Sequence, residues 1–138
     1  MAEDTRGQSE QVYELFLRGR RLLEEGVYAG AAECLQRAAE AEPGKGSILE
    51  MLGRARYGQR LFSLAAAAFR EAVAVDPTND YAHYCLGMCC LKLSMITEAR
   101  GHFRIAWSLR PLEDYREKAI VFNAPGSQRA GGATFPGR

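Results

Sequence analysis

The chain has 138 residues, and its eighteen basic and seventeen acidic side chains give a formal net charge of +1. This length corresponds to one domain, which can bury a sizeable core without metals or disulfides. A near-neutral charge argues against a dedicated nucleic-acid binder, and no apolar run approaches the roughly 20 residues of a membrane span. The polar, acidic start lacks the pattern of a secretory signal, so we expect a cytoplasmic protein that does not insert into membranes.

The composition changes at both ends of the chain. Residues 1–11 are polar, and residues 124–138 are rich in Gly, Pro and Ala, so we expect a flexible tail at 1–11 and a disordered tail at 124–138. Between them, apolar residues recur every three or four positions, which is the helical period. The pattern predicts an all-α domain over 12–123, with helices at 12–25, 29–41, 46–59, 63–75, 80–93, 97–109 and about 112–123.

A 34-residue period runs through this helical region. Pro43, Pro77 and Pro111 are each 34 residues apart, and proline ends a helix because it has no N–H to donate. Small and bulky residues repeat at the same spacing, so we expect two helices in each unit to approach closely at the small side chains and the bulky ones to fill the space between units. The further columns are Gly19, Gly53 and Gly87; Ala31, Ala65 and Ala99; Leu35, Phe69 and Phe103; and Ala38, Ala72 and Ala106.

This pattern resembles the tetratricopeptide repeat family, whose signature is W-x2-L-G-x2-Y…A-x3-F…P over 34 residues. Leu52-Gly53 and Leu86-Gly87 match the Leu-Gly pair, whereas the Trp column holds Leu15, Leu49 and His83, and the Tyr column holds Leu22, Arg56 and Cys90. The resemblance implies repeats at 12–45, 46–79 and 80–113. It further implies a right-handed α-solenoid of three helix-turn-helix units, closed by a capping helix at 112–123.

In this family the first helices of the repeats line a concave groove, and the resemblance implies a peptide-binding site there. The expected groove residues are Tyr13, Phe16, Arg20, Glu50, Arg54, Tyr57, Tyr81, Tyr84, Met88 and Tyr115. Tyr and Arg are enriched in binding hot spots, since both combine contact area with hydrogen-bonding ends. Two alternatives stay open: the tyrosines can pack between neighbouring helices, and Arg20 and Arg54 can be solvated rather than hold an acidic group.

One subset of the family holds the C-terminal carboxylate of chaperones with a clamp of Lys, Asn and Arg. The corresponding positions here hold Phe16, Arg20, Met51, Tyr81 and Cys85. None of them matches the clamp. We therefore expect a mixed aromatic and basic groove that binds a different peptide.

The cysteines and histidines do not predict a metal or catalytic site. Cys85 and Cys89 share a helix face, but His83 and Cys90 point elsewhere, and a structural zinc site needs four convergent ligands. We expect all four cysteines to be reduced thiols, with Cys89 and Cys90 in the core. His102 has no nucleophile at a recognisable spacing, so no catalytic residue, metal or cofactor is expected.

The remaining basic cluster is RGRR in the first predicted helix. Its arginines fan around the helix and two glutamates follow, which favours a solvated face over a nucleic-acid or membrane surface. The sequence thus predicts a non-enzymatic protein-interaction module that binds a protein or peptide partner as a monomer. Two alternatives are a chaperone similar to those of type III secretion and a scaffold that assembles with copies of itself.

Overall fold

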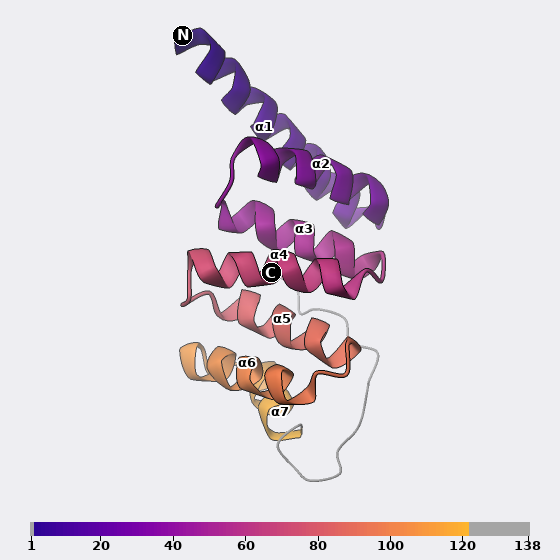
Figure 1. Ribbon diagram of the computed structural model, residues 1–138, viewed down its shortest axis with the longest axis vertical. Coiled ribbons are helices and arrows are strands. Elements are labelled where there is room, and N and C mark those ends of the chain that lie inside the picture. The colour runs from indigo at the N-terminus through magenta and orange to yellow at the C-terminus, as the bar shows by residue number, and fades with distance from the viewer. Residues whose placement is uncertain (1, 122–138) are drawn as a thin grey trace.

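In a computed structural model, which describes residues 2–121, the chain forms seven α-helices and no strand within that range (Figure 1). The helices follow one another as three pairs and a final single helix, stacked along the long axis of the molecule. This arrangement is an all-α helical-repeat solenoid. The helices are α1 (Ala2–Glu24), α2 (Tyr28–Ala41), α3 (Gly46–Gly58), α4 (Phe62–Val75), α5 (Asp80–Lys92), α6 (Ile96–Leu109) and α7 (Glu113–Val121).

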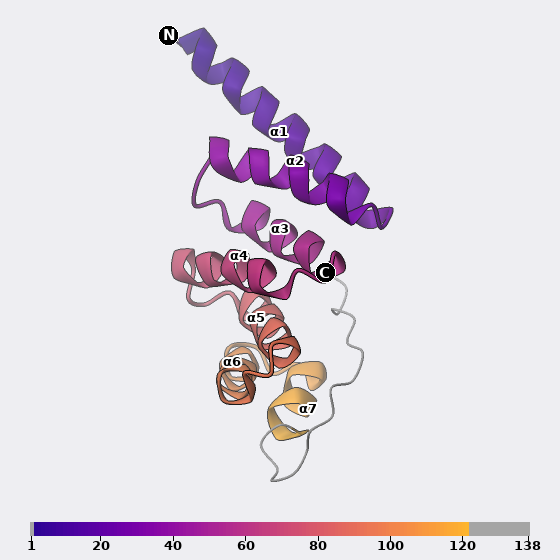
Figure 2. The same cartoon turned by 45° about the vertical axis from the view of Figure 1, so that its right-hand side comes forward.

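The first helix begins ten residues earlier than the sequence pattern predicts. Residues 2–11, which we expected to be a flexible tail, are helical, and α1 extends past the end of α2 (Figures 1 and 2). A helix is costly to start but cheap to extend. Glu and Gln in this polar stretch therefore continue the helix that the packed residues from Val12 onward stabilise.

The last helix begins at Glu113, one residue after the expected start, and is described as far as Val121. Its expected end at 123 lies outside the described residues. The predicted disordered tail at 124–138 lies outside the described residues.

Each first helix ends in the same turn, one repeat apart. Gly26, Arg60 and Ser94 adopt left-handed backbone conformations, with φ of 77°, 65° and 60°. The N–H of the next residue in each turn donates a hydrogen bond to a carbonyl oxygen five residues back, as in a Schellman motif. Glycine adopts this conformation freely, whereas Arg60 and Ser94 each adopt it at a cost of about 1 kcal/mol.

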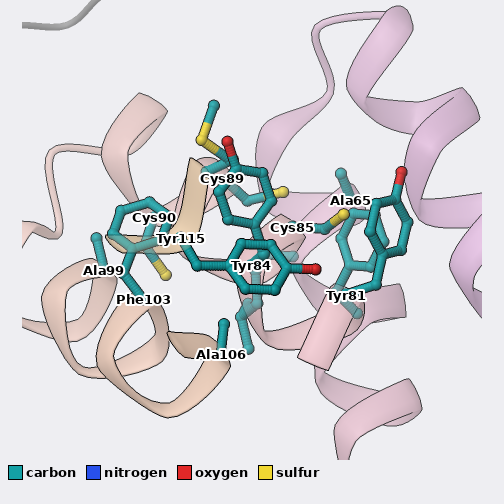
Figure 3. Packing of buried hydrophobic residues seen from close by; sticks show 14 of the residues in the cluster. Ala65, Tyr81, Tyr84, Cys85, Cys89, Cys90, Ala99, Phe103, Ala106 and Tyr115 are labelled. Carbon is teal, nitrogen blue, oxygen red and sulfur yellow. The ribbon is translucent and has the colours of Figure 1, made fainter. Parts of the chain in front are cut away.

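The repeated Gly and Phe columns pack against each other inside the repeats, whereas we expected the bulky column to fill the space between units. A Cβ atom added to Gly53 would lie 2.6 Å from the Phe69 ring, and one added to Gly87 would lie 2.6 Å from the Phe103 ring. Such contacts are too close for any side chain, which explains why glycine stands opposite phenylalanine. The Ala columns are also fully buried, and Figure 3 shows Ala65, Ala99 and Ala106 within the core of the last repeats.

The small-residue columns predict a sharp contrast between two alanines on α4. Ala65 is fully buried, whereas Ala67 is exposed. We expect Ala65→Leu to lower the free energy of unfolding by about 1–3 kcal/mol because the core has no room for a larger side chain. Ala67→Leu makes the same change in helix propensity at an exposed position, and it should shift the free energy of unfolding by less than about 0.5 kcal/mol. Urea titrations of both variants test the register, and equal effects would contradict it.

Candidate peptide-binding groove

The expected groove residues on α1 and α3 are accessible. Tyr13 is the most open of them, with 62% of its surface exposed, and Arg20 is also exposed. Phe16, Arg54 and Tyr57 are partly exposed, with Phe16 resting against the core of the first repeat. The two first helices therefore present aromatic and basic side chains to solvent.

A hollow of about 340 Å³ lies between α1 and the beginning of α3. The lining combines apolar side chains with a carboxylate, an ammonium and three hydroxyl groups, so it can hold an apolar side chain whose backbone is hydrogen-bonded at the rim. Tyr13 and Phe16 were expected here from the sequence, whereas Ser9 belongs to the stretch expected to be a tail. The lining residues are Ser9, Val12, Tyr13, Phe16, Glu42, Lys45, Ser47 and Ile48.

Glu50 has a structural role that the sequence did not indicate. Its carboxylate accepts a hydrogen bond of 3.0 Å from the side-chain amide of Asn79. The Asn79 oxygen in turn caps α5 by accepting a bond of 3.1 Å from the N–H of Ala82. Glu50 thus fixes the start of α5 against α3.

Four expected groove residues, three in the last repeat and one on α7, are buried, which corrects the expectation that they are open to a ligand. Tyr81, Tyr84, Met88 and Tyr115 are only 1–3% exposed. Tyr115 of α7 packs on Tyr84 with ring centres 4.9 Å apart, and its hydroxyl donates a 2.8 Å hydrogen bond to Asp80 (Figure 3).

This burial has two causes: α5 packs between α4 and α6, and α7, which lies beside α6, places Tyr115 in the core against Tyr84 (Figure 2). The open part of the groove is therefore formed by α1 and α3. Burial also raises the pKa of Tyr84 to about 12, with the nearby Asp114 carboxylate adding to the effect. One signal for this packing was present in the sequence: Tyr115 and Ala119 are four residues apart and form the buried face of α7.

The four cysteines are free and buried, and the expected core positions of Cys89 and Cys90 are confirmed. Burial raises the pKa of Cys89 to about 12 and that of Cys90 to about 11. The thiolate is the reactive form of cysteine, so these thiols are chemically inert in the folded protein. Among the described residues, no group of three or more His, Cys, Asp or Glu side chains is placed to hold a metal.

The two histidines form a pair that sequence reasoning missed. The Nδ1 atoms of His83 and His102 are 3.1 Å apart, and the rings stack at 28°. Nε2 of His83 lies 2.9 Å from the carbonyl oxygen of Pro77, which can only accept, so this nitrogen donates. In neutral His83 the Nδ1 atom then accepts, and His102 donates to it.

A proton can bind the outer nitrogen of His102. This Nε2 lies 3.7 Å from a Glu98 oxygen, and Arg70 of α4 binds the same oxygen at 2.9 Å. A proton there leaves the bond between the rings intact but places a charge in a half-buried site beside the His83 ring. The stability of the link between α5 and α6 therefore depends on the protonation state of His102.

This geometry predicts a loss of stability in mild acid. Burial and the neighbouring His83 ring lower the pKa of His102 below its ordinary value of 6.5, although Glu98 opposes the shift. The unfolded chain then binds more protons, so the free energy of unfolding decreases as the pH falls below about 6.5. Arg70 lowers the pKa of Glu98, so Glu98 stabilises the fold above pH 4.5 and changes the stability little between pH 7 and 5.

Denaturant titrations at pH 7 and pH 5 give the free energy of unfolding at each pH. The decrease in this free energy from pH 7 to pH 5 should be smaller in His102→Gln than in the wild type. An equal decrease in both proteins would contradict the assignment to His102.

No described helix is both long and apolar enough to cross a membrane. A sequence model of the tetratricopeptide repeat matches residues 16–73 and 50–111. No curated protein sequence matches the chain significantly.

Solved structures of similar fold share little sequence with this chain. The second tetratricopeptide domain of human RPAP3, in complex with the HSP70 peptide SGPTIEEVD, is 19% identical with a TM-score of 0.79, over 85% of this chain and 98% of that one. The Yersinia enterocolitica type III secretion chaperone SycD, in complex with a peptide of the translocator YopD, is 14% identical with a TM-score of 0.77, over 83% and 93% of the two chains. The Arabidopsis OM64 domain is 17% identical with a TM-score of 0.80, over 84% and 97%.

Proposed function

We propose that this chain, which belongs to the tetratricopeptide repeat family, binds a segment of a partner protein in the open groove of α1 and α3. The observation that carries the proposal is the hollow beside Tyr13, where an exposed aromatic ring borders a partly apolar cavity. An exposed ring next to a cavity is typical of binding hot spots, because both lose water when an apolar side chain enters.

The arginines on α1 and α3 favour an acidic or polar centre in the bound segment. Neither Arg20 nor Arg54 forms an ion pair within the described part of the chain. A guanidinium binds a carboxylate through two parallel hydrogen bonds, which fixes orientation as well as adding affinity. Apolar side chains of the partner would fill the hollow, and its acidic groups would set the register along α3.

Known structures of this fold support a role in protein interaction and not one particular partner. The RPAP3 domain and SycD are each described with a peptide bound. Their low identity to this chain shows the common fold alone. We assign no catalytic residue, and the groove of α1 and α3 does not favour a secretion chaperone or a self-assembling scaffold over a monomeric peptide receptor.

The groove is tested by a variant that alters exposed side chains only. Tyr13→Ala combined with Arg20→Gln should weaken the affinity for a partner, captured from the source cells and then purified, by about 2–4 kcal/mol. Titration calorimetry measures the affinity, and circular dichroism should be unchanged because both side chains are exposed.

The matched control changes the outer face of the second helices. Arg37→Gln with Leu64→Ala also removes one charge and one exposed apolar side chain, from α2 and α4. This control should bind the partner as the wild type does. If the control loses the partner while the groove variant retains it, the second helices carry the interaction and the proposal is wrong.

A further inference from the structure

Next to Tyr57 of the groove, two cations lie over one aromatic ring. The guanidinium carbon of Arg60 is 5.7 Å from the centre of the Phe62 ring, and the Lys92 ammonium is 5.8 Å from the same point. Tyr57 meets Phe62 edge to face, with ring centres 5.1 Å apart. We call these four residues the Phe62 corner. It joins the turn between α3 and α4 to the end of α5, on one edge of the stack (Figure 1).

Neither cation of the corner is paired with an acidic side chain in the part of the chain that the structure describes. No carboxylate there lies within ion-pair distance of Arg60 or Lys92. Contact with a ring face attracts a cation but leaves its N–H donors free to bind an anion. Two like charges beside one ring repel each other, and a bound anion relieves this repulsion.

The turn that carries Arg60 has a backbone conformation that glycine prefers. Its left-handed conformation costs about 1 kcal/mol, and the same turn in the first repeat uses Gly26 instead. Ser94 occupies the third turn, so the fold tolerates this cost elsewhere. Of the three turns, only the one at Arg60 places a charge beside the groove.

We propose that the Phe62 corner binds adjacent carboxylates of the partner segment, as in a Glu-Glu pair. This inference rests on the proposed groove, because Tyr57 belongs to both. The two cations match two neighbouring carboxylates, and the ring accommodates the aliphatic part of the acidic side chains. A nucleic-acid backbone would require a broader basic surface than two cations in a chain of net charge +1.

The test uses two synthetic peptides as probes. The first is SGPTIEEVD, which contains a Glu-Glu pair and binds the human RPAP3 domain; the second is its neutral counterpart SGPTIQQVN with an amidated C-terminus. Fluorescence anisotropy gives both affinities, and NMR of the labelled protein follows the amides of Leu61, Phe62 and Lys92. The acidic peptide should bind about tenfold more tightly than the neutral one and shift these amides.

The variant Arg60→Gly with Lys92→Gln removes both charges. Glycine suits the left-handed turn, so Arg60→Gly should not lower the melting temperature, and a loss of binding cannot be attributed to unfolding. We expect this variant to bind the acidic peptide about tenfold less tightly and the neutral peptide unchanged. Arg37→Gln with Arg104→Gln removes two exposed charges elsewhere and should bind both peptides as the wild type does.

The possible results separate the corner from the groove. If the corner variant binds both peptides normally while Tyr13→Ala with Arg20→Gln loses both, the groove stands and the corner proposal is wrong. If the acidic peptide at millimolar concentration shifts none of the three amides, the corner proposal is also overturned. A single-stranded oligothymidylate serves as a further probe. If it binds as tightly as the acidic peptide and with the same dependence on Arg60 and Lys92, the ligand of the corner is a phosphate backbone and the peptide proposal is wrong.

Discussion

Replacing Phe103 by alanine should lower the free energy of unfolding by about 3–5 kcal/mol. Phe103 is fully buried, and its ring lies against Gly87 and 5.6 Å from the Tyr84 ring. Glycine at position 87 has no side chain that could move into the space left by the ring. The resulting cavity would remain open, which adds to the lost burial energy.

The effect should concentrate in the last repeat. Each unit of a repeat array contacts only its neighbours, so a cavity between α5 and α6 weakens that unit first. Hydrogen exchange should therefore become faster in α5, α6 and α7 than in α1 and α2, alongside a lower urea midpoint.

Trp107→Ala provides the control on the same helix. Trp107 lies one turn after Phe103, is 38% exposed and is also large and aromatic. Trp107→Ala should lower the free energy of unfolding clearly less than Phe103→Ala does. A similar loss for both would mean that the period of 34 does not identify the core positions of α6.

The repeat itself could be predicted from the sequence because its signals are local and steric. Gly53 and Phe69 occupy matching columns since one needs the space that the other leaves, and proline ends a helix wherever it occurs. These constraints act within a unit of 34 residues. The five helices from α2 to α6 each begin and end within two residues of the predicted positions, and α7 begins one residue after its predicted start.

The exposure of the groove could not be predicted in the same way. Tyr13 and Tyr81 occupy equivalent positions, yet one is open and the other is buried, because α5 packs between α4 and α6 whereas α1 lies at the end of the stack (Figure 1). Burial of Tyr84 depends on where α7 lies, and α7 is not part of the repeat. The pair of His83 and His102 joins two helices across 19 residues, so no local spacing indicates it.

The roles of the charged side chains in the groove could be predicted only in part. Arg20 is open, as expected, but Glu50 binds Asn79 instead of facing a ligand. Arg60 was not expected to contribute, since turn positions do not line the groove in the family pattern. Its backbone conformation and its contact with Phe62 are visible only in three dimensions.

Replacing Tyr115 by alanine should detach α7 from the core and lower the free energy of unfolding by about 2–4 kcal/mol. Tyr115 is the largest of the fully buried side chains, and Ala119 is the only other buried residue that α7 contributes within the described part of the chain. A helix of nine residues does not hold its structure in water without such packing. The loss of this one ring should therefore unfold α7 while α1 to α4 stay intact.

Tyr115→Phe separates the packing of the ring from its hydrogen bond. This variant removes the hydroxyl and its 2.8 Å bond to Asp80 and should lower the free energy of unfolding by about 1 kcal/mol, with α7 still in place. Amide hydrogen exchange over 113–121 provides the measurement: protection should disappear in Tyr115→Ala and persist in Tyr115→Phe. Loss of α7 would also expose Tyr84 and Met88, which should make the alanine variant bind hydrophobic dyes more strongly. Full protection of α7 in Tyr115→Ala would show that α6 holds this helix without the ring, and the groove would then end at α5 for a different reason.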